Sequence, residues 1–258
     1  GETMIRKCHI IQYETLVKNN EKPSDGAILL IESLLKRHIP FLVVTDRSNQ
    51  TKKELCIHMR AMGFPTFSEG GIYTSTMAAR DWIARKYPTR IKANYIGGRG
   101  LKEVLVEAGF VLNCEDPHWI FIGSESHLDA IDLNRDIQKI KKGAVLISTD
   151  SSREHIDRDK QCIAAGAITR LLEYAANTKA LEFGRPSLVT LSYALRYTGY
   201  KEDEVLIVSD DYGADILPAL QCHYETAFVA TDTSFMEIQK DKDLHPKWIV
   251  DSLSGLAH

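Results

Sequence analysis

The sequence lacks any arrangement of cysteines that would build a disulfide framework or a structural zinc site. Its five cysteines are an odd number, lie far apart along 258 residues and include no C-x-x-C pair. Small secreted domains depend on dense disulfides, and zinc sites need closely spaced ligands. We therefore expect a protein of a reducing compartment, with the cytoplasm as the default location.

Long apolar runs are missing as well, because no stretch approaches the roughly 20 residues that a membrane-spanning helix needs. The N-terminal residues carry no apolar segment of the kind that directs secretion. The formal net charge is only −3, from 32 basic and 35 acidic residues. We therefore expect neither a nucleic acid nor a membrane surface as a partner.

What the sequence does contain is a series of short β-branched apolar runs that alternate with helical patterns. Such alternation is typical of an α/β fold with a parallel sheet. The strands expected in the main sheet are Cys8–Tyr13, Phe41–Thr45, Val205–Ser209, Thr226–Ala230 and Trp248–Val250. The first three are followed by polar residues, and such strand ends line the ligand crevice of an open α/β sheet.

The helical patterns and the middle of the chain predict the domain organisation. A helix is expected near Ser24–His38, with Ser24 as its N-cap, and another near Thr51–Met62, ended by Gly63. The middle section has its own signals at Ala93–Ile96, Leu101–Ala108, Trp119–Ile122, Leu128–Lys141 and Ala144–Ser148. The first sheet is expected to resume only near Phe183. We therefore predict a core domain of residues 1–73 and 180–258, with a second α/β domain of residues 74–179 inserted into it.

The polar residues after these strands form an ordered series of short motifs. They are Gln12-Tyr13-Glu14-Thr15, Thr45-Asp46, Gly184-Arg185-Pro186, and Ser209-Asp210-Asp211 with Asp215. Between the second and third of these motifs lie two further segments, Gly97-Gly98-Arg99-Gly100 and Phe121-Ile122-Gly123-Ser124-Glu125. In order and spacing the series resembles the haloacid-dehalogenase superfamily, and more narrowly its NagD-like, 4-nitrophenylphosphatase-like branch, over nearly the whole chain. The resemblance implies a Rossmann-like core with a parallel sheet and an inserted α/β cap domain.

The resemblance also implies a chemistry. In this family a strand-end aspartate attacks phosphorus, and a second aspartate two residues later is the general acid and base. A Thr or Ser and a Lys hold the phosphoryl oxygens, and an acidic loop helps to bind Mg²⁺. The implied partners are a phosphorylated small molecule or phosphate, and a second copy of the chain bound through the cap as a homodimer.

Carried over to this sequence, the resemblance places Gln12 at the nucleophile position and Glu14 at the acid/base position. A neutral amide is a poor nucleophile, so the covalent route should fail there. Thr45 and Asp46 match the phosphate-binding segment. Arg185 stands where lysine is usual and keeps its charge with a different geometry.

The same comparison assigns metal binding to Asp210, with Asp215 as the supporting acid and Asp211 as a further candidate. Ser209 replaces the customary glycine. Mg²⁺ prefers carboxylate oxygens, so a glutamine at position 12 should weaken its binding. Each residue also has a simpler interpretation: Gln12 and Thr45 as polar strand ends, Arg185 as a surface residue, and the three aspartates as turn and helix-cap residues.

Three hypotheses for function follow. The first is a degraded phosphatase that binds phosphate or a phosphoester with weak or no hydrolase activity. The second is an active Mg²⁺-dependent phosphomonoester hydrolase of the sugar-phosphate or nitrophenyl-phosphatase type, with a rearranged site that uses Glu14 or an activated water. The third is a non-catalytic scaffold. The sequence of the inserted domain carries no pattern that selects a substrate.

Overall fold

The computed structural model describes residues 5–124, 129–230 and 244–258 of the chain, which divides into two compact units. The first unit comprises Gly1–Thr45, Lys53–Tyr73 and Leu191–His258, and the second comprises Asp46–Lys52 and Thr74–Thr190. Residues 46–52 and 180–190, which the sequence assigned to the core, therefore group with the second unit. The interpretation of the two units as core and cap stays a prediction. Glu125 and Leu128 lie outside the described residues.

The first unit is built on a six-stranded sheet with the order β14-β13-β12-β1-β4-β5. Its strands are β1 (Cys8–Gln12), β4 (Phe41–Thr45), β5 (Ile72–Thr74), β12 (Val205–Ser209), β13 (Glu225–Val229) and β14 (Trp248–Val250). The pairs from β14 through to β4 are parallel. The α/β class and the five strands expected from the sequence are confirmed to within one residue at each end.

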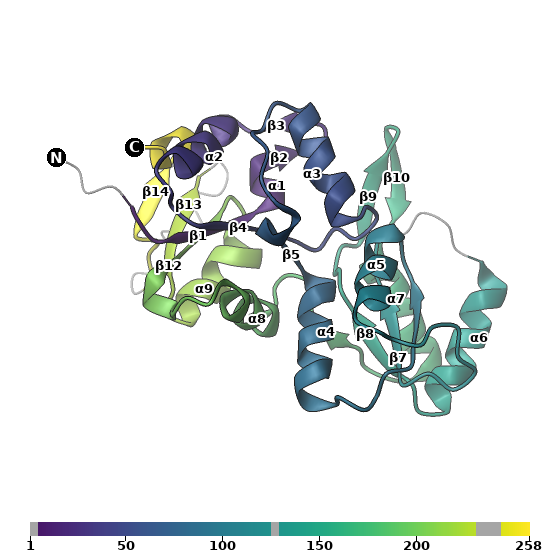
Figure 1. Cartoon of the computed structure of the whole chain (residues 1–258). Coiled ribbons are helices and arrows are strands. Elements are labelled where there is room, and N and C mark those ends of the chain that lie inside the picture. The colour runs from purple at the N-terminus through teal and green to yellow at the C-terminus, as the bar shows by residue number, and fades with distance from the viewer. Residues whose placement is uncertain (1–4, 125–128, 231–243) are drawn as a thin grey trace. The chain divides into compact units, whose positions relative to one another are not determined.

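Helices cover both faces of this sheet. Side chains alternate between the faces of a strand: in β13, Ala227 joins the core cluster formed with α2 and α3, whereas Phe228 packs with the residues of η3 and α9. The remaining elements of this unit are α1 (Tyr13–Leu16), β2 (Val17–Lys18), β3 (Lys22–Pro23), α2 (Ala27–Lys36), α3 (Lys52–Ala61), η1 (Glu69–Gly71), α8 (Leu188–Thr198), η2 (Glu202–Glu204), the π-helical turn η3 (Tyr212–Ile216), α9 (Leu217–Gln221) and η4 (Leu253–Leu256). Figure 1 shows α2 on one side of β1 and α9 on the other.

The start of α2 differs from the prediction. Ser24 is not the N-cap; the cap residue is Gly26, whose φ of 75° lies in the left-handed region. A Cβ built on Gly26 would lie 2.2 Å from the backbone nitrogen of Ser254 and 2.8 Å from the Ser252 hydroxyl. The helix therefore begins where the chain passes against the C-terminal turn, and the yellow C-terminal segment lies beside α2 in Figure 1.

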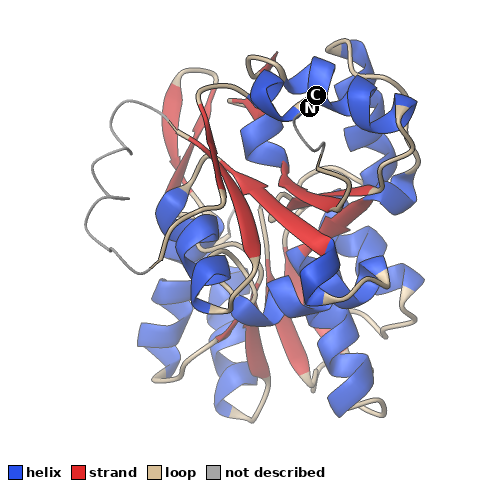
Figure 2. Cartoon of the chain, turned by 90° about the vertical axis from the view of Figure 1, so that its left-hand side faces the viewer, coloured by secondary structure: helices blue, strands red, loops and turns tan. Residues whose placement is uncertain are grey.

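The second unit contains a parallel four-stranded sheet with the order β11-β8-β7-β6. Its elements are α4 (Ser75–Lys86), β6 (Ala93–Ile96), α5 (Arg99–Glu107), β7 (Trp119–Ile122), α6 (Ala130–Lys141), β8 (Val145–Ser148), β9 (Glu154–Asp157), β10 (Lys160–Ile163), α7 (Ala165–Ala176) and β11 (Leu181–Glu182). Ile120 and Ile122 pack toward α6 and α7, while Trp119 meets Trp82 of α4 with ring centroids 6.1 Å apart. In both units helices flank the parallel strands (Figure 2).

The region near Phe183 corrects a second prediction. The sheet of the first unit does not resume there, because β11 pairs with β8 of the second unit. The first sheet resumes only at Val205, the start of β12. The two residues of β11 are too few to show any periodicity, so no local pattern indicates which sheet they join. In the part of the chain that the structure describes, no helix is long and apolar enough to cross a membrane.

Asp136 of α6 provides a stability prediction. Burial raises the pKa of this carboxyl from 3.8 to about 6; Lys139 lowers it and Asp132 raises it. Because the folded pKa lies above the unfolded one, the charged form is disfavoured in the native state, and stability is lost as the pH rises from about 4 to about 6. We expect Asp136→Asn to increase the free energy of unfolding by about 1–2 kcal/mol near pH 7.5, after allowing for solvent screening.

The gain should nearly vanish near pH 3, below both pKa values, where the carboxyl is mostly neutral in both states. Thermal unfolding at the two pH values measures it, and Asp157→Asn, at an exposed position of β9 in the same unit, is the control. An equal gain at both pH values would show that burial of charge is not the cause.

Candidate active site

Gln12 is the last residue of β1, in the middle of the six-stranded sheet, and pairs in register with Val44 of β4. The strand continues directly into the single helical turn α1, so the two residues after Gln12 turn out of the sheet. The Gln12 Oε1 atom is buried and has no hydrogen-bond partner among the described residues. A buried amide oxygen without a donor is costly, so a hydrogen-bond donor that bound at this atom would be stabilising.

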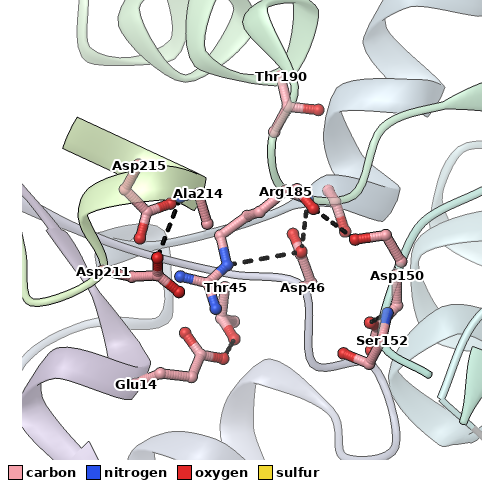
Figure 3. Close-up of polar contacts among 12 residues, drawn as sticks. Glu14, Thr45, Asp46, Asp150, Ser152, Arg185, Thr190, Asp211, Ala214 and Asp215 are labelled. Carbon is pink, nitrogen blue, oxygen red and sulfur yellow. Dashed lines mark hydrogen bonds and ion pairs between the residues drawn. The ribbon is translucent and has the colours of Figure 1, made fainter. Parts of the chain in front are cut away.

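Glu14 and Thr45 form the second feature of this strand end. The Thr45 hydroxyl donates a hydrogen bond of 2.7 Å to Glu14 Oε1, and Figure 3 shows the two side chains turned toward each other. Thr45 is the last residue of β4 and is almost fully buried. Glu14 Oε2 is buried and has no partner within the described ranges. One carboxylate oxygen is therefore held in place, and the other keeps its hydrogen-bonding capacity for a further donor.

Thr15 connects this turn to the end of β12. Its hydroxyl donates to Asp210 Oδ1 at 3.1 Å and accepts from the Asp210 backbone N–H at 3.0 Å. A residue without a side-chain hydroxyl at this position could make neither bond. Thr15 therefore positions both the backbone and the side chain of Asp210.

Lys18 contacts the same carboxylate from β2. Its ammonium group forms an ion pair and hydrogen bond with Asp210 Oδ2 and donates to the backbone carbonyl oxygen of Glu14 at 3.2 Å. The side chain of Lys18 is half exposed, whereas that of Asp210 is only 17% exposed. Both oxygens of Asp210 are thus paired within the first unit.

The other two aspartates after β12 have structural roles. The Asp211 side chain accepts from the Ala214 backbone N–H at 3.0 Å and caps η3, as the dashed line in Figure 3 marks. Asp215 Oδ2 accepts from the buried Ser209 hydroxyl at 2.6 Å, and Ser209 Oγ in turn accepts from the Asp211 N–H. The simpler interpretation, in which these residues serve a turn and a helix start, accounts for these bonds.

Asp46 and Arg185 lie together in the second unit. The Arg185 backbone N–H donates to Asp46 Oδ2 at 2.8 Å, and Nε lies 3.8 Å from the same oxygen. The Arg185 carbonyl accepts from the Ser151 hydroxyl, and Figure 3 draws these contacts beside the Asp150–Ser152 turn. Asp46 therefore offsets part of the guanidinium charge. The phosphate-binding roles of both residues stay predictions of the sequence.

The residues present do not suit the Mg²⁺ that the resemblance implies. Hard divalent cations need several oxygen ligands, carboxylates above all. Gln12 contributes no charge, and the Asp210 carboxylate is paired with Lys18. Among residues 5–124, 129–230 and 244–258, no three His, Cys, Asp or Glu side chains are grouped so as to hold a metal ion. Metal ligation by Asp210, Asp211 and Asp215, with weakened affinity, therefore stays a prediction of the sequence.

Sequence reasoning missed Lys18 altogether and gave Thr15 no function. Neither residue stands at the end of a main strand, and a lysine followed by two asparagines is typical of a solvated turn. The available signal is their neighbourhood: Thr15 and Lys18 follow Gln12 within six residues, where Gln12 and Glu14 already stand in place of the two aspartates of the family. Only the fold shows that both side chains meet Asp210.

Comparisons with known proteins agree with this architecture. A family model described as haloacid dehalogenase-like hydrolase matches residues 14–111, and one described as HAD-hydrolase-like matches residues 182–256. An acid sugar phosphatase of Staphylococcus epidermidis is 26% identical over 250 residues, which cover 96% of this chain and 95% of that protein.

Two solved structures share the fold. A mutant of the thermostable p-nitrophenylphosphatase from Bacillus stearothermophilus matches with a TM-score of 0.84 at 24% identity, covering 97% of this chain and 98% of that one. NagD from E. coli K-12 matches with a TM-score of 0.84 at 22% identity, covering 98% of both chains. With both family models and the order of the motifs in agreement, this protein belongs to the haloacid-dehalogenase superfamily.

Proposed function

We propose that this phosphatase homologue binds phosphate or a phosphorylated small molecule and hydrolyses it slowly or not at all. The observation that carries the proposal is Gln12, an amide at the end of the central strand β1 where the family resemblance calls for a carboxylate. An amide carries no negative charge and cannot form an acyl-phosphate intermediate by displacement. The chemical step is therefore lost even though the fold that surrounds it is retained.

Groups that suit a bound ligand remain at the same strand ends. Thr45 keeps its hydroxyl, and the buried Gln12 Oε1 and Glu14 Oε2 atoms, which have no partner in the described part of the chain, can accept hydrogen bonds. A monoprotonated phosphate, or the hydroxyls of a sugar phosphate, would supply the donors. Because relatives are named acid sugar phosphatase and p-nitrophenylphosphatase, sugar and aryl phosphates are the first ligands to test.

The test combines turnover with binding. We expect the wild-type protein with Mg²⁺ to release p-nitrophenol from p-nitrophenyl phosphate no faster than a buffer blank. We expect about 10 mM inorganic phosphate to raise its Tm by about 2–4 °C, since a ligand that binds only the native state stabilises it. Thr45→Val should lose that shift, whereas Thr198→Val, at the end of α8 in the same unit, should keep it.

Two outcomes would lead to the other hypotheses. The first is robust turnover by the wild type that Glu14→Gln abolishes; it would establish a working hydrolase with Glu14 as the reacting carboxylate. The buried Glu14 Oε2 atom, which has no partner among the described residues, favours this alternative. No protection by phosphate, sugar phosphate or aryl phosphate, together with no turnover, would leave a non-catalytic scaffold. Either result would overturn the proposed function.

A further inference from the structure

We propose that the Lys18 ammonium group replaces the divalent cation at this site, so that the protein has a built-in monovalent charge where its relatives would need a bound metal. This inference deepens the proposed function, and it rests on that function only for the identity of the anion that the site receives. It concerns three described residues of the first unit: Lys18, Asp210 and Gln12.

The first argument is the pair of oxygens that Lys18 contacts. One is the carboxylate Oδ2 of Asp210 and the other is the backbone carbonyl of Glu14. Carboxylate and carbonyl oxygens are the ligands that a hard cation selects. An ammonium group that binds both occupies the place from which a metal ion would be coordinated by Asp210. A metal that binds these same two oxygens would have to displace Lys18.

The second argument is charge. An aspartate at position 12 together with Mg²⁺ would contribute one net positive charge to the site. Gln12 together with Lys18 also contributes one net positive charge. The two departures from a metal-dependent arrangement add: removing one negative charge and adding one positive charge together supply the two positive charges that a divalent cation would bring.

The third argument is rigidity. Asp210 is only 17% exposed on its side chain, and Thr15 holds its Oδ1 and its backbone N–H. These bonds fix the orientation of the Asp210 carboxylate and therefore the position of Oδ2. Lys18, which contacts Oδ2, lies in β2, a short strand that begins directly after α1. An ammonium has three donors, and two of them are used by Asp210 and Glu14. The third is available to an oxygen of a bound phosphate.

The experiment measures metal binding without phosphate. We expect about 10 mM MgCl₂ to leave the Tm of the wild-type protein within about 1 °C of a NaCl control of equal ionic strength. We expect Lys18→Met to gain a shift of about 2–4 °C with the same MgCl₂, because the Asp210 carboxylate is then free to bind the cation. Lys22→Met is the matched control, since Lys22 is exposed and pairs with Lys18 across β2 and β3; it should behave as the wild type.

A saturable Mg²⁺ shift in the wild type would overturn the inference, and so would a Lys18→Met variant that folds and shows no Mg²⁺ response. If that variant does not fold, titration of the wild type with Mn²⁺, followed by the electron paramagnetic resonance of the free ion, decides alone: stoichiometric loss of the signal contradicts the inference. Failure of phosphate to protect the protein is a separate result, because it would remove the proposed ligand and leave the metal measurements unchanged.

Discussion

A Gln12→Asp, Lys18→Met double variant should hydrolyse p-nitrophenyl phosphate in the presence of Mg²⁺ at least about 100-fold faster than the wild type. The first change supplies a carboxylate at the end of β1, and the second releases Asp210 from its ion pair. Glu14 and Thr45 are already joined by a hydrogen bond beside that position. The carboxylate introduced at position 12 would then serve as the nucleophile, and together with Asp210 it would provide two carboxylates that can bind a cation.

The single variants separate the two contributions. Gln12→Asp alone should show a smaller gain, because Lys18 still competes for Asp210, and Lys18→Met alone should show none, because an amide remains at position 12. Gln12→Asn in the Lys18→Met background is the control for side-chain shortening without charge. Initial rates of p-nitrophenol release measure all five proteins. A double variant no faster than the wild type would mean that more than these two side chains has been lost.

The second large effect concerns stability. Gly26→Ala should lower the free energy of unfolding by about 3–4 kcal/mol, from backbone strain and overpacking together. The φ of Gly26 is 75°, and an added Cβ would lie 2.2 Å from the backbone nitrogen of Ser254. Because this contact is with the backbone, no side-chain rotation can relieve it. Either α2 or the C-terminal turn must shift. Urea denaturation followed by circular dichroism measures the loss.

Gly199→Ala is a matched control within the same unit. Its φ is 76°, almost identical to that of Gly26, but no atom of the described residues lies within 4 Å of the added Cβ. It should therefore show the strain alone, about 1–2 kcal/mol. Equal losses in the two variants would show that the approach of Ser254 to Gly26 contributes nothing to the cost.

The strands could be predicted well from the sequence because their signal is local. Runs such as Phe41–Thr45 and Val205–Ser209 are apolar up to their last residue, are followed by polar residues and are largely buried in a parallel sheet. Strands that run parallel end at the same edge of a sheet, so the polar residues that follow them could be grouped there from their order alone. Their resemblance to a family then identified Gln12 as the departure of most consequence.

The features that the sequence could not predict depend on contacts between distant residues. Gly26 rather than Ser24 caps α2, because Ser252 and Ser254 approach it from the other end of the chain. Lys18 binds Asp210, which lies 192 residues away along the chain. Residues 46–52 group with the second unit although β4, which they follow, belongs to the first. No local pattern encodes such partners.

The order of strands in the first sheet has a consequence for how the chain is made. β1 pairs with β12, and the register that joins Cys8 to Val205 spans the whole of the second unit. During synthesis β1 and β4 precede residues 74–190, and β12, the other partner of β1, follows only after those residues have been produced. Until then β1 has an unpaired, apolar edge, a state in which nascent chains are prone to associate.

The core of the first unit is complete only when the C-terminal turn η4 is present. Leu253 and Leu256 are buried in its core, and the Ser33 hydroxyl of α2 donates to the carbonyl of Ala257 at 3.0 Å. The second unit, whose residues from 74 to 190 are continuous, can fold while the ribosome is still adding these last turns. The unit that carries Gln12 and Lys18 therefore cannot complete its core until Leu253 and Leu256 have been made, after the whole of the second unit.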